Sequence, residues 1–230
     1  MTLYRIADLY SCAGGAGWGY ARTGRLKPTG YDIVDRPRYP LDFVQADAVE
    51  TLKRIIAGDI VVDAIHASPP CQKRCSLTRG TNAHLADRYS DFYPETRELM
   101  EATGLPGVIE NPSARPDVVL CGEMFGLGVI RHRNFELVNW TTDFNYKRDH
   151  KKHRGRVRGY RHGEWFDGPY VAAYGNGGGK ASVQEMQDAM GIHWTDVREE
   201  LTEAIPPAFT HWIGGRLVEH LDATTLEVAA

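Results

Sequence analysis

The chain of 230 residues lacks any apolar run close to the ~20 residues that a membrane-spanning helix needs. Its first residues contain no apolar stretch and no cleavage site typical of a signal peptide, so we expect no membrane partner and a cytoplasmic location. Cysteines are also few, which argues against a disulfide scaffold and favours a reducing compartment. The four are Cys12, Cys71, Cys75 and Cys121.

Two further features are missing. No Gly-Lys-Ser or Gly-Lys-Thr phosphate loop occurs, so ATP is not an expected ligand. The formal net charge is only -3, which decides neither for nor against nucleic acid. The distribution of charge is more informative, because the segment 147–161 holds eight lysines and arginines against the single acidic residue Asp149. A solvated surface loop is the plain alternative, but we expect these cations to contact nucleic-acid phosphates.

What the chain does contain is an alternation of strand-like and helix-like segments. We expect strands at 4–10, 31–34, 43–45, 61–67, 108–109 and 135–140. We expect helices at 14–23, 48–57, 96–103, 183–190 and 197–203, and a last helix opened by Pro206 and Pro207. This alternation predicts an α/β, Rossmann-like, doubly wound and mostly parallel sheet.

The expected organisation has three parts. Residues 1–140 form a catalytic, cofactor-binding core that includes a long irregular loop at 76–93. Residues 141–180 form a small basic recognition insertion with little regular structure, and residues 181–230 form a helical part that completes the core.

The most informative stretch is Ser68-Pro69-Pro70-Cys71, which follows a buried strand. Open α/β sheets place their chemistry at the carboxyl ends of strands, and a second strand ends there in Glu110. An ionised thiol is a nucleophile, and a poorly solvated carboxyl can keep a proton at neutral pH. The pair suits attack on an electron-poor ring whose nitrogen is protonated as the nucleophile adds.

Three other strand ends predict an adenosine pocket. The small residues of the loop Ser11 to Gly15 allow backbone N–H groups to approach a ligand at a helix N-terminus. Asp32 ends the second strand, where nucleotide sites place a ribose-binding carboxylate. Asp47 follows the third strand and is placed to accept from an adenine amino group.

Each of these residues also has an ordinary structural interpretation. Cys71 could be a small buried apolar residue, and Glu110 a salt-bridge partner. Cys71 and Cys75 with nearby histidines could be imagined as a zinc site, but their spacing is loose and we expect no metal. Met186 and Met190 are interpreted as core residues.

The ordered motifs DLYSCAGG, GYDIV, QAD, SPPCQ, VIENP, RHRNFEL and AIPPAF resemble the DNA (cytosine-5) methyltransferase family. The resemblance runs from Asp8 to about Leu221, and the combination of PPCQ with ENP is its most specific part. It implies S-adenosylmethionine as the cofactor, double-stranded DNA as the partner and a monomer. The short recognition region resembles compact enzymes of bacterial viruses, and so implies a bacterial host cell.

The resemblance also implies roles for individual residues. It implies Cys71 as the nucleophile, Glu110 as the acid at cytosine N3, and Arg133 as a contact to the flipped base. The whole expected catalytic set is Cys71, Gln72, Glu110, Arg131 and Arg133. The expected cofactor set is Tyr10, Ser11, Cys12, Ala13, Gly14, Gly15, Asp32, Ile33, Asp47, Ala48, Pro69 and Glu203. The expected DNA contacts are Lys73, Arg74, Lys151, Lys152, Arg154, Arg156 and Arg158.

Three departures from the family pattern stand out. Cys12 replaces a glycine beside the methionine pocket, Val129 replaces a glutamine before the paired arginines, and Glu203 replaces an asparagine beside the cofactor. Three rival functions remain: the same chemistry on RNA, a catalytically silent nucleic-acid-binding module, and methylation of free nucleotides. Retention of Cys71 and Glu110 disfavours the second, and the basic segment disfavours the third.

Overall fold

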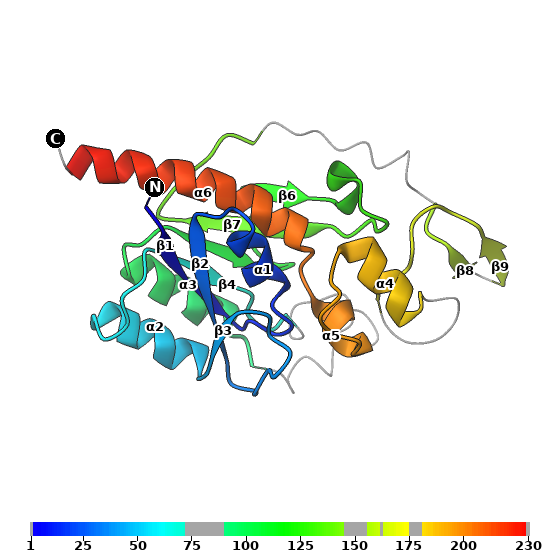
Figure 1. Cartoon of the computed structure of the whole chain (residues 1–230), viewed down its shortest axis with the longest axis horizontal. Helices are drawn as coiled ribbons and strands as arrows, with labels where there is room; N and C mark the ends of the chain where they lie inside the picture. Colours follow the sequence, from blue (N-terminus) through cyan, green and yellow to red (C-terminus); the bar gives the residue numbers. More distant parts are fainter. Residues whose placement is uncertain (1, 72–89, 145–155, 162, 175–180, 229–230) are drawn as a thin grey trace.

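The computed structural model describes residues 2–71, 90–144, 156–161, 163–174 and 181–228. Seven of the described strands form one sheet in the order β3-β2-β1-β4-β5-β7-β6 (Figure 1). All neighbours pair in parallel except β7, which is antiparallel to both β5 and β6. The expected Rossmann-like, mostly parallel sheet is therefore confirmed.

The strands of this sheet are short, and all except the exposed edge strand β3 are largely buried. Their bounds are β1 Tyr4–Leu9, β2 Leu26–Asp32, β3 Asp42–Gln45, β4 Ala64–Ala67, β5 Gly107–Glu110, β6 Val118–Leu120 and β7 Arg133–Val138. The parallel register places Leu9 beside Ala67, and Ala67 beside Ile109. The carboxyl ends of β1, β4 and β5 therefore open side by side on one edge of the sheet.

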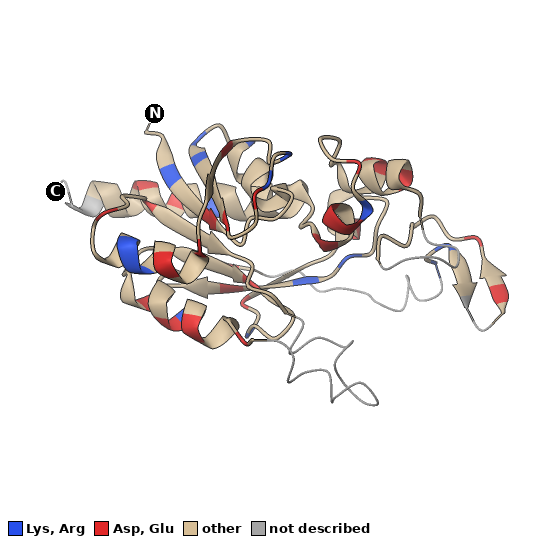
Figure 2. Cartoon of the chain, turned by 90° about the horizontal axis from the view of Figure 1, so that it is seen from below, with Lys and Arg blue, Asp and Glu red and all other residues tan. Residues whose placement is uncertain are grey.

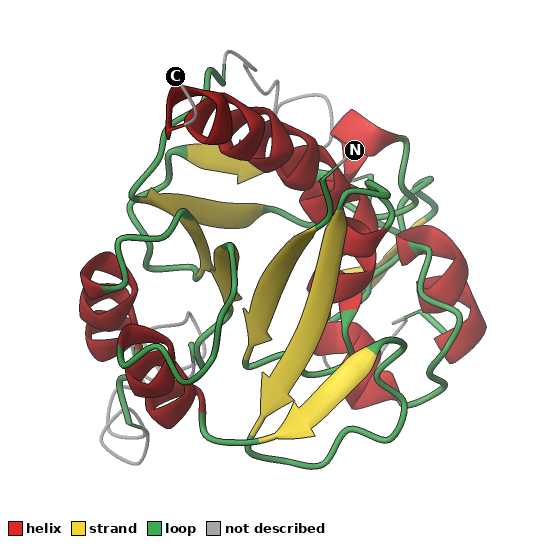
Figure 3. Cartoon of the chain, turned by 60° about the vertical axis from the view of Figure 1, so that its left-hand side comes forward, coloured by secondary structure: helices red, strands yellow, loops and turns green. Residues whose placement is uncertain are grey.

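Helices cover both faces of the sheet, as Figure 3 shows. On one face lie α1 (Gly15–Ala21) and the long α6 (Pro207–Val228). On the other face lie α2 (Ala48–Ile56) and α3 (Tyr93–Ala102). The alternation of side chains along β1 divides the core, because Ile6 packs toward Tyr20 and Phe209 while Leu9 packs toward Leu52.

The remaining elements lie at the carboxyl edge and beyond it. These are the 3-10 helix η3 (Gly122–Phe125), the hairpin β8 (Gly159–Arg161) and β9 (Glu164–Phe166), α4 (Val183–Met190) and α5 (Arg198–Glu203). Met186 and Met190 are buried in a third apolar cluster with Val129 and Ala173, which confirms them as core residues. This cluster joins Val171 and Ala173 to α4 and α5. The expected boundary between two parts of the chain at residue 180 remains a prediction.

Several expected boundaries were wrong. The second strand begins at Leu26 rather than Tyr31, because Leu26 to Pro28 pair with Tyr4 to Ile6. The fourth strand begins at Ala64 rather than Val61, and the hairpin β8–β9 gives the insertion more regular structure than expected. The loop 76–93 was expected to be irregular, but α3 begins within it at Tyr93; its residues 76–89 lie outside the described ones. None of the described helices combines the length and apolarity needed to cross a membrane.

Candidate active site

The ends of β4 and β5 bring the expected thiol and carboxyl to one edge of the sheet. Cys71 lies four residues after the end of β4, and Glu110 is the last residue of β5. The side-chain amide of Asn111, next to Glu110, donates to the carbonyl of Pro69 at 3.1 Å. Asn111 is buried, so this hydrogen bond fixes the Cys71 loop against the end of β5.

His66 on β4 also supports the loop that carries Cys71, because its ring hydrogen-bonds with Ser68. The His66 ring lies between the Tyr20 hydroxyl, at 3.0 Å, and the Ser68 hydroxyl, at 2.9 Å. Burial lowers the pKa of His66 to about 3, so the ring is neutral and serves as a hydrogen-bonding support. We did not predict His66 or Asn111 as site residues, although His66 lies just before the SPPCQ motif and Asn111 lies within the VIENP motif.

Glu110 faces the guanidinium group of Arg133, which is the first residue of the antiparallel strand β7. The Arg133 Nε lies 3.3 Å from a Glu110 carboxylate oxygen, and both side chains are largely buried. Burial raises the pKa of Glu110 above its ordinary value, against the opposing effects of Arg133 and Arg131. A carboxyl in this setting can hold a proton for transfer to a ligand and remain oriented by an arginine.

Arg131 was expected in the catalytic set, but its hydrogen bonds are structural. Its guanidinium group donates to the carbonyl of Ala173 at 2.7 Å and to the carbonyl of Thr202. Burial lowers the pKa of Arg131 well below its ordinary value, with the charge of Arg133 as a second cause. Arg131 therefore ties the segment around Ala173 to α5, while Arg133 faces Glu110.

The loop after β1 forms the second half of the site. Cys12 has a φ of 44°, in the left-handed region that favours glycine, and its N–H donates to Asp32 at 2.9 Å. The Ser11 hydroxyl is buried and has no hydrogen-bond partner within the part of the chain that the structure describes. An unsatisfied buried hydroxyl beside a backbone loop fits a polar ligand, so these residues are compatible with the expected cofactor.

Asp32 is buried and already engaged. Besides Cys12, it accepts from the N–H of Val34 at 3.0 Å, and its carboxylate lies 3.2 Å from the Nε of Arg36. A ribose hydroxyl would share this carboxylate with Arg36, which we did not predict. Ile33, beside it, is 66% exposed at the same edge and offers an apolar surface to a ring.

Asp47 lies where we expected it, after β3, but has a structural role. It is exposed and caps α2, because one carboxylate oxygen accepts from the N–H of Glu50 at 2.9 Å. Ala48 is the first residue of that helix and is buried. The second carboxylate oxygen of Asp47 is the part of the side chain that could receive an adenine amino group.

Glu203, at the end of α5, points toward the same loop. Its carboxylate lies 3.8 Å from the Sγ of Cys12. Burial raises the pKa of the Cys12 thiol to about 12, so the thiol keeps its proton, and burial also raises the pKa of Glu203. Two of the family departures therefore meet in space, at the expected methionine end of the cofactor site.

The glycines of this loop are needed for packing within the chain. A side chain at Gly15 would place a Cβ atom 2.1 Å from the carbonyl oxygen of Ile205, at the entrance of α6. A Cβ at Gly14, which has a φ of +80°, would lie 2.6 Å from Pro40. We expected these glycines to admit a ligand, whereas their neighbours are other parts of the protein.

An ion pair that the sequence did not reveal holds α5 over the site. Arg38, in the loop between β2 and β3, donates to both carboxylate oxygens of Glu200 at 3.1 and 2.8 Å. With Arg131 bound to Thr202 on the other side, α5 spans the cofactor half and the Glu110 half of the site. Such long-range pairs carry no local sequence signal.

Several predicted contacts lie outside the described residues: Gln72, Lys73, Arg74, Lys151, Lys152 and Arg154. Two of the predicted DNA contacts, Arg156 and Arg158, are described. Arg158 forms an ion pair with Glu185 on α4. This ion pair holds the segment around Arg158 against α4. It also makes the Arg158 guanidinium group less available for phosphate contacts. Arg156 contributes its carbonyl to the N–H of Tyr170.

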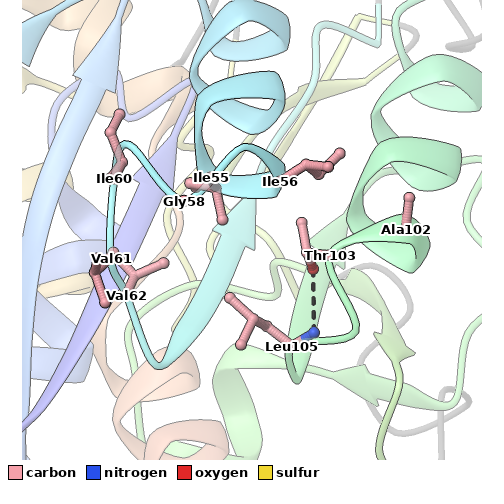
Figure 4. A pocket seen from close by; sticks show the side chains of 9 residues that line it. All are labelled: Ile55, Ile56, Gly58, Ile60, Val61, Val62, Ala102, Thr103 and Leu105. Atoms are coloured by element: carbon pink, nitrogen blue, oxygen red, sulfur yellow. Dashed lines mark hydrogen bonds between the residues drawn. The ribbon is translucent and has the colours of Figure 1, made fainter.

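A cavity of about 200 Å³ lies at the opposite edge of the sheet (Figure 4). It is lined by aliphatic side chains from the ends of α2 and α3 and from the segment before β4. The Thr103 hydroxyl, which accepts from the N–H of Leu105 at 3.1 Å, is a polar group at its rim. This cavity lies at the amino ends of β4 and β5, whereas the candidate active site lies at their carboxyl ends. The two are therefore separate.

Comparison with known proteins supports the fold. Neither protein-family models nor curated proteins gave a sequence match. Among solved structures, the methyltransferase EhMeth of Entamoeba histolytica is similar with a TM-score of 0.60 at 11% identity, over 96% of this chain and 99% of that one. The Dnmt2 methyltransferase of S. pombe is similar with a TM-score of 0.57 at 15% identity, again over 96% and 99%. The chain thus shares the Rossmann-like fold of these two structures along nearly its whole length.

Proposed function

We propose that the chain is an S-adenosylmethionine-dependent cytosine C5-methyltransferase that acts on DNA. The observation that carries this proposal is the junction of β4 and β5. There, the loop bearing Cys71 is hydrogen-bonded through Pro69 and Asn111 to the strand end bearing Glu110. A thiol and a buried carboxyl with a raised pKa on adjacent strand ends suit covalent addition to a ring that must accept a proton.

In the proposed reaction, the Cys71 thiolate forms a bond to C6 of a cytosine extruded from the helix. Addition at C6 moves ring electrons toward N3. Glu110 gives its proton to N3 at the same time, so no unstabilised negative charge develops on the ring. Arg133 keeps the Glu110 carboxyl oriented and stabilises the carboxylate that remains. Transfer of the methyl group to C5 would leave S-adenosylhomocysteine. A base then removes the C5 proton, the bond from Cys71 to C6 breaks to release the thiolate, and the N3 proton returns to the Glu110 carboxylate.

Bound S-adenosylmethionine would supply the electrophilic methyl group. The residues that would hold it are Ser11, whose buried hydroxyl lacks a partner, Asp32 and Asp47 at successive strand ends, and the exposed side chain of Ile33. Glu203 and Cys12 would face its methionine portion. Tyr10 and Ala13 follow β1 and Pro69 follows β4 at the same edge, where the carbonyl of Ala13 accepts from Trp194 and that of Pro69 accepts from Asn111.

The choice of DNA, as a duplex bound by a monomer, rests on the basic segment and on the resemblance to compact enzymes of bacterial viruses. The same chemistry on RNA is the second candidate, because base addition does not depend on the sugar. Both structural neighbours carry the name methyltransferase, and this agrees with either nucleic acid.

The test is expression in a host whose DNA lacks 5-methylcytosine, followed by sequencing of DNA and RNA for the modified base. The proposal expects 5-methylcytosine in DNA with the wild-type protein and none with Cys71→Ala. Modification in RNA alone would keep the chemistry and reject the substrate. Absence of 5-methylcytosine from both, with a folded and cofactor-binding protein, would reject the function.

A further inference from the structure

The hairpin β8–β9 exposes two aromatic rings at one end of the molecule. Tyr160 is 62% exposed and Trp165 is 45% exposed. They are direct cross-strand partners, and their ring centroids lie 5.0 Å apart in an edge-on arrangement. Figures 1 and 2 show the hairpin at the end opposite both termini, projecting from the body of the protein.

Contacts at its base hold this hairpin in place. The N–H of Arg158 donates to the carbonyl of Tyr170 at 2.7 Å, and the N–H of Val171 donates to the carbonyl of Gly128 at 2.8 Å. The ion pair of Arg158 with Glu185 adds a side-chain anchor on α4. The aromatic pair is thus presented outward from a fixed base.

The sequence around the hairpin indicates the kind of partner. The segment 147–161, whose last three residues are β8, carries eight lysines and arginines against one aspartate in the sequence. Aromatic rings next to cations are the combination that binds nucleic acid without dependence on sequence, because the cations meet phosphates and the rings stack on bases. An uncharged partner would match the rings but would not account for so large an excess of positive charge, whereas the nucleic acid of the proposed function matches both.

We propose that Tyr160 and Trp165 form a stacking platform that binds an unpaired base of the nucleic acid. The proposal rests on the proposed function for the identity of the polymer, but it concerns binding and not methyl transfer. Stacking on one aromatic side chain favours binding by roughly 5- to 150-fold per base.

The experiment compares two single strands of equal length and charge, one of thymidine and one abasic, by fluorescence titration without cofactor. Cytosine is absent, so the Cys71 and Glu110 site makes no target contact. We expect the wild-type protein to prefer the thymidine strand at least roughly fivefold and its tryptophan emission to fall on binding. The double variant Tyr160→Ala/Trp165→Ala should bind both strands equally.

Two controls separate stacking from a purely structural role of the pair. Tyr160→Phe keeps the ring and should keep the preference. Val61→Ala removes an exposed apolar side chain, 59% exposed, at the opposite edge of the sheet and should also keep it. Equal binding of both strands by the wild-type protein, or an unchanged preference in the double variant, would overturn the proposal. Because no turnover is measured, either result is independent of whether cytosine is methylated.

Discussion

Replacement of Asp8 by asparagine should change how the stability of the protein depends on pH. Asp8 is fully buried in β1, where one carboxylate oxygen accepts from the N–H of Gly17 at 3.1 Å and from the Tyr39 hydroxyl at 2.9 Å. Burial raises the pKa of Asp8 from 3.8 to about 7, against the lowering effect of these two hydrogen bonds. Asp8 is therefore a group that titrates near neutral pH inside the core.

The sign of the effect follows from linkage. Between pH 3.8 and about 7 the unfolded chain has lost the Asp8 proton while the folded chain keeps it, so stability falls as pH rises. The slope is about 1.4 kcal/mol per pH unit, and the whole window corresponds to about 4 kcal/mol. Asparagine cannot ionise, yet its side-chain oxygen can still accept from Gly17 and Tyr39.

His66, which is beside Asp8 in the register of β1 and β4, has the opposite effect. Burial lowers the pKa of His66 to about 3, so below pH 6.5 the unfolded chain binds a proton that the folded chain does not. The two slopes oppose each other in the wild-type protein between pH 4 and 6.5. In Asp8→Asn the slope from His66 remains, and stability should rise with pH.

The assay is urea unfolding of the wild-type protein and of Asp8→Asn at pH 4.5, 5.5, 6.5 and 7.5. We expect the stability difference to move in favour of the variant by about 1.4 kcal/mol per pH unit from pH 4.5 to 6.5, and by less from pH 6.5 to 7.5, where Asp8 also ionises in the folded protein. Asp222→Asn is the matched control, because hydrogen bonds from Tyr4 and Arg25 lower the pKa of Asp222, and its effect lies at lower pH. A difference between wild type and Asp8→Asn that is constant with pH would refute the reasoning.

Three further predictions concern the candidate site. Asp47→Ser keeps the cap on α2, and Asp47→Ala loses it at a cost of about 1 kcal/mol; both should weaken S-adenosylmethionine binding in calorimetry, and unchanged affinity in Asp47→Ser would remove this carboxylate from the site. Glu203→Asn should lower the preference for S-adenosylmethionine over the uncharged thioether S-adenosylhomocysteine, because a carboxylate favours the sulfonium; an identical ratio of the two dissociation constants would contradict this. Arg38→Ala should release Glu200 and increase hydrogen exchange in α5 while exchange in β1 stays unchanged, and equal protection of α5 in both proteins would show that the ion pair does not hold it.

The sequence predicted the order of strands and helices because apolar runs alternate with amphipathic ones along the chain. It also predicted which strand ends carry Cys71, Glu110, Asp32 and Asp47, because each residue lies at or within four residues of the end of a strand-like segment. The beginning of β2 was missed because Lys27 and Pro28 interrupt its pattern, although Leu26 pairs with Tyr4. The short β6 was missed for lack of length.

The contacts between distant residues could not be predicted. Nothing local shows that Arg38 pairs with Glu200, or that the Arg131 guanidinium group donates to the carbonyls of Ala173 and Thr202. The reason for Gly15 was also hidden, because its neighbour Ile205 comes from the opposite end of the chain. These contacts depend on tertiary packing and are fixed once the sheet has formed.

The most direct test of the proposed function uses DNA in which the target cytosines are replaced by 5-fluorocytosine. Fluorine cannot leave as a cation, so the bond between Cys71 and C6 should persist after methyl transfer. We predict a protein–DNA adduct that resists denaturation, requires S-adenosylmethionine, and is absent in Cys71→Ala. Methylation of ordinary DNA without any adduct on the fluorinated DNA would contradict covalent catalysis by Cys71.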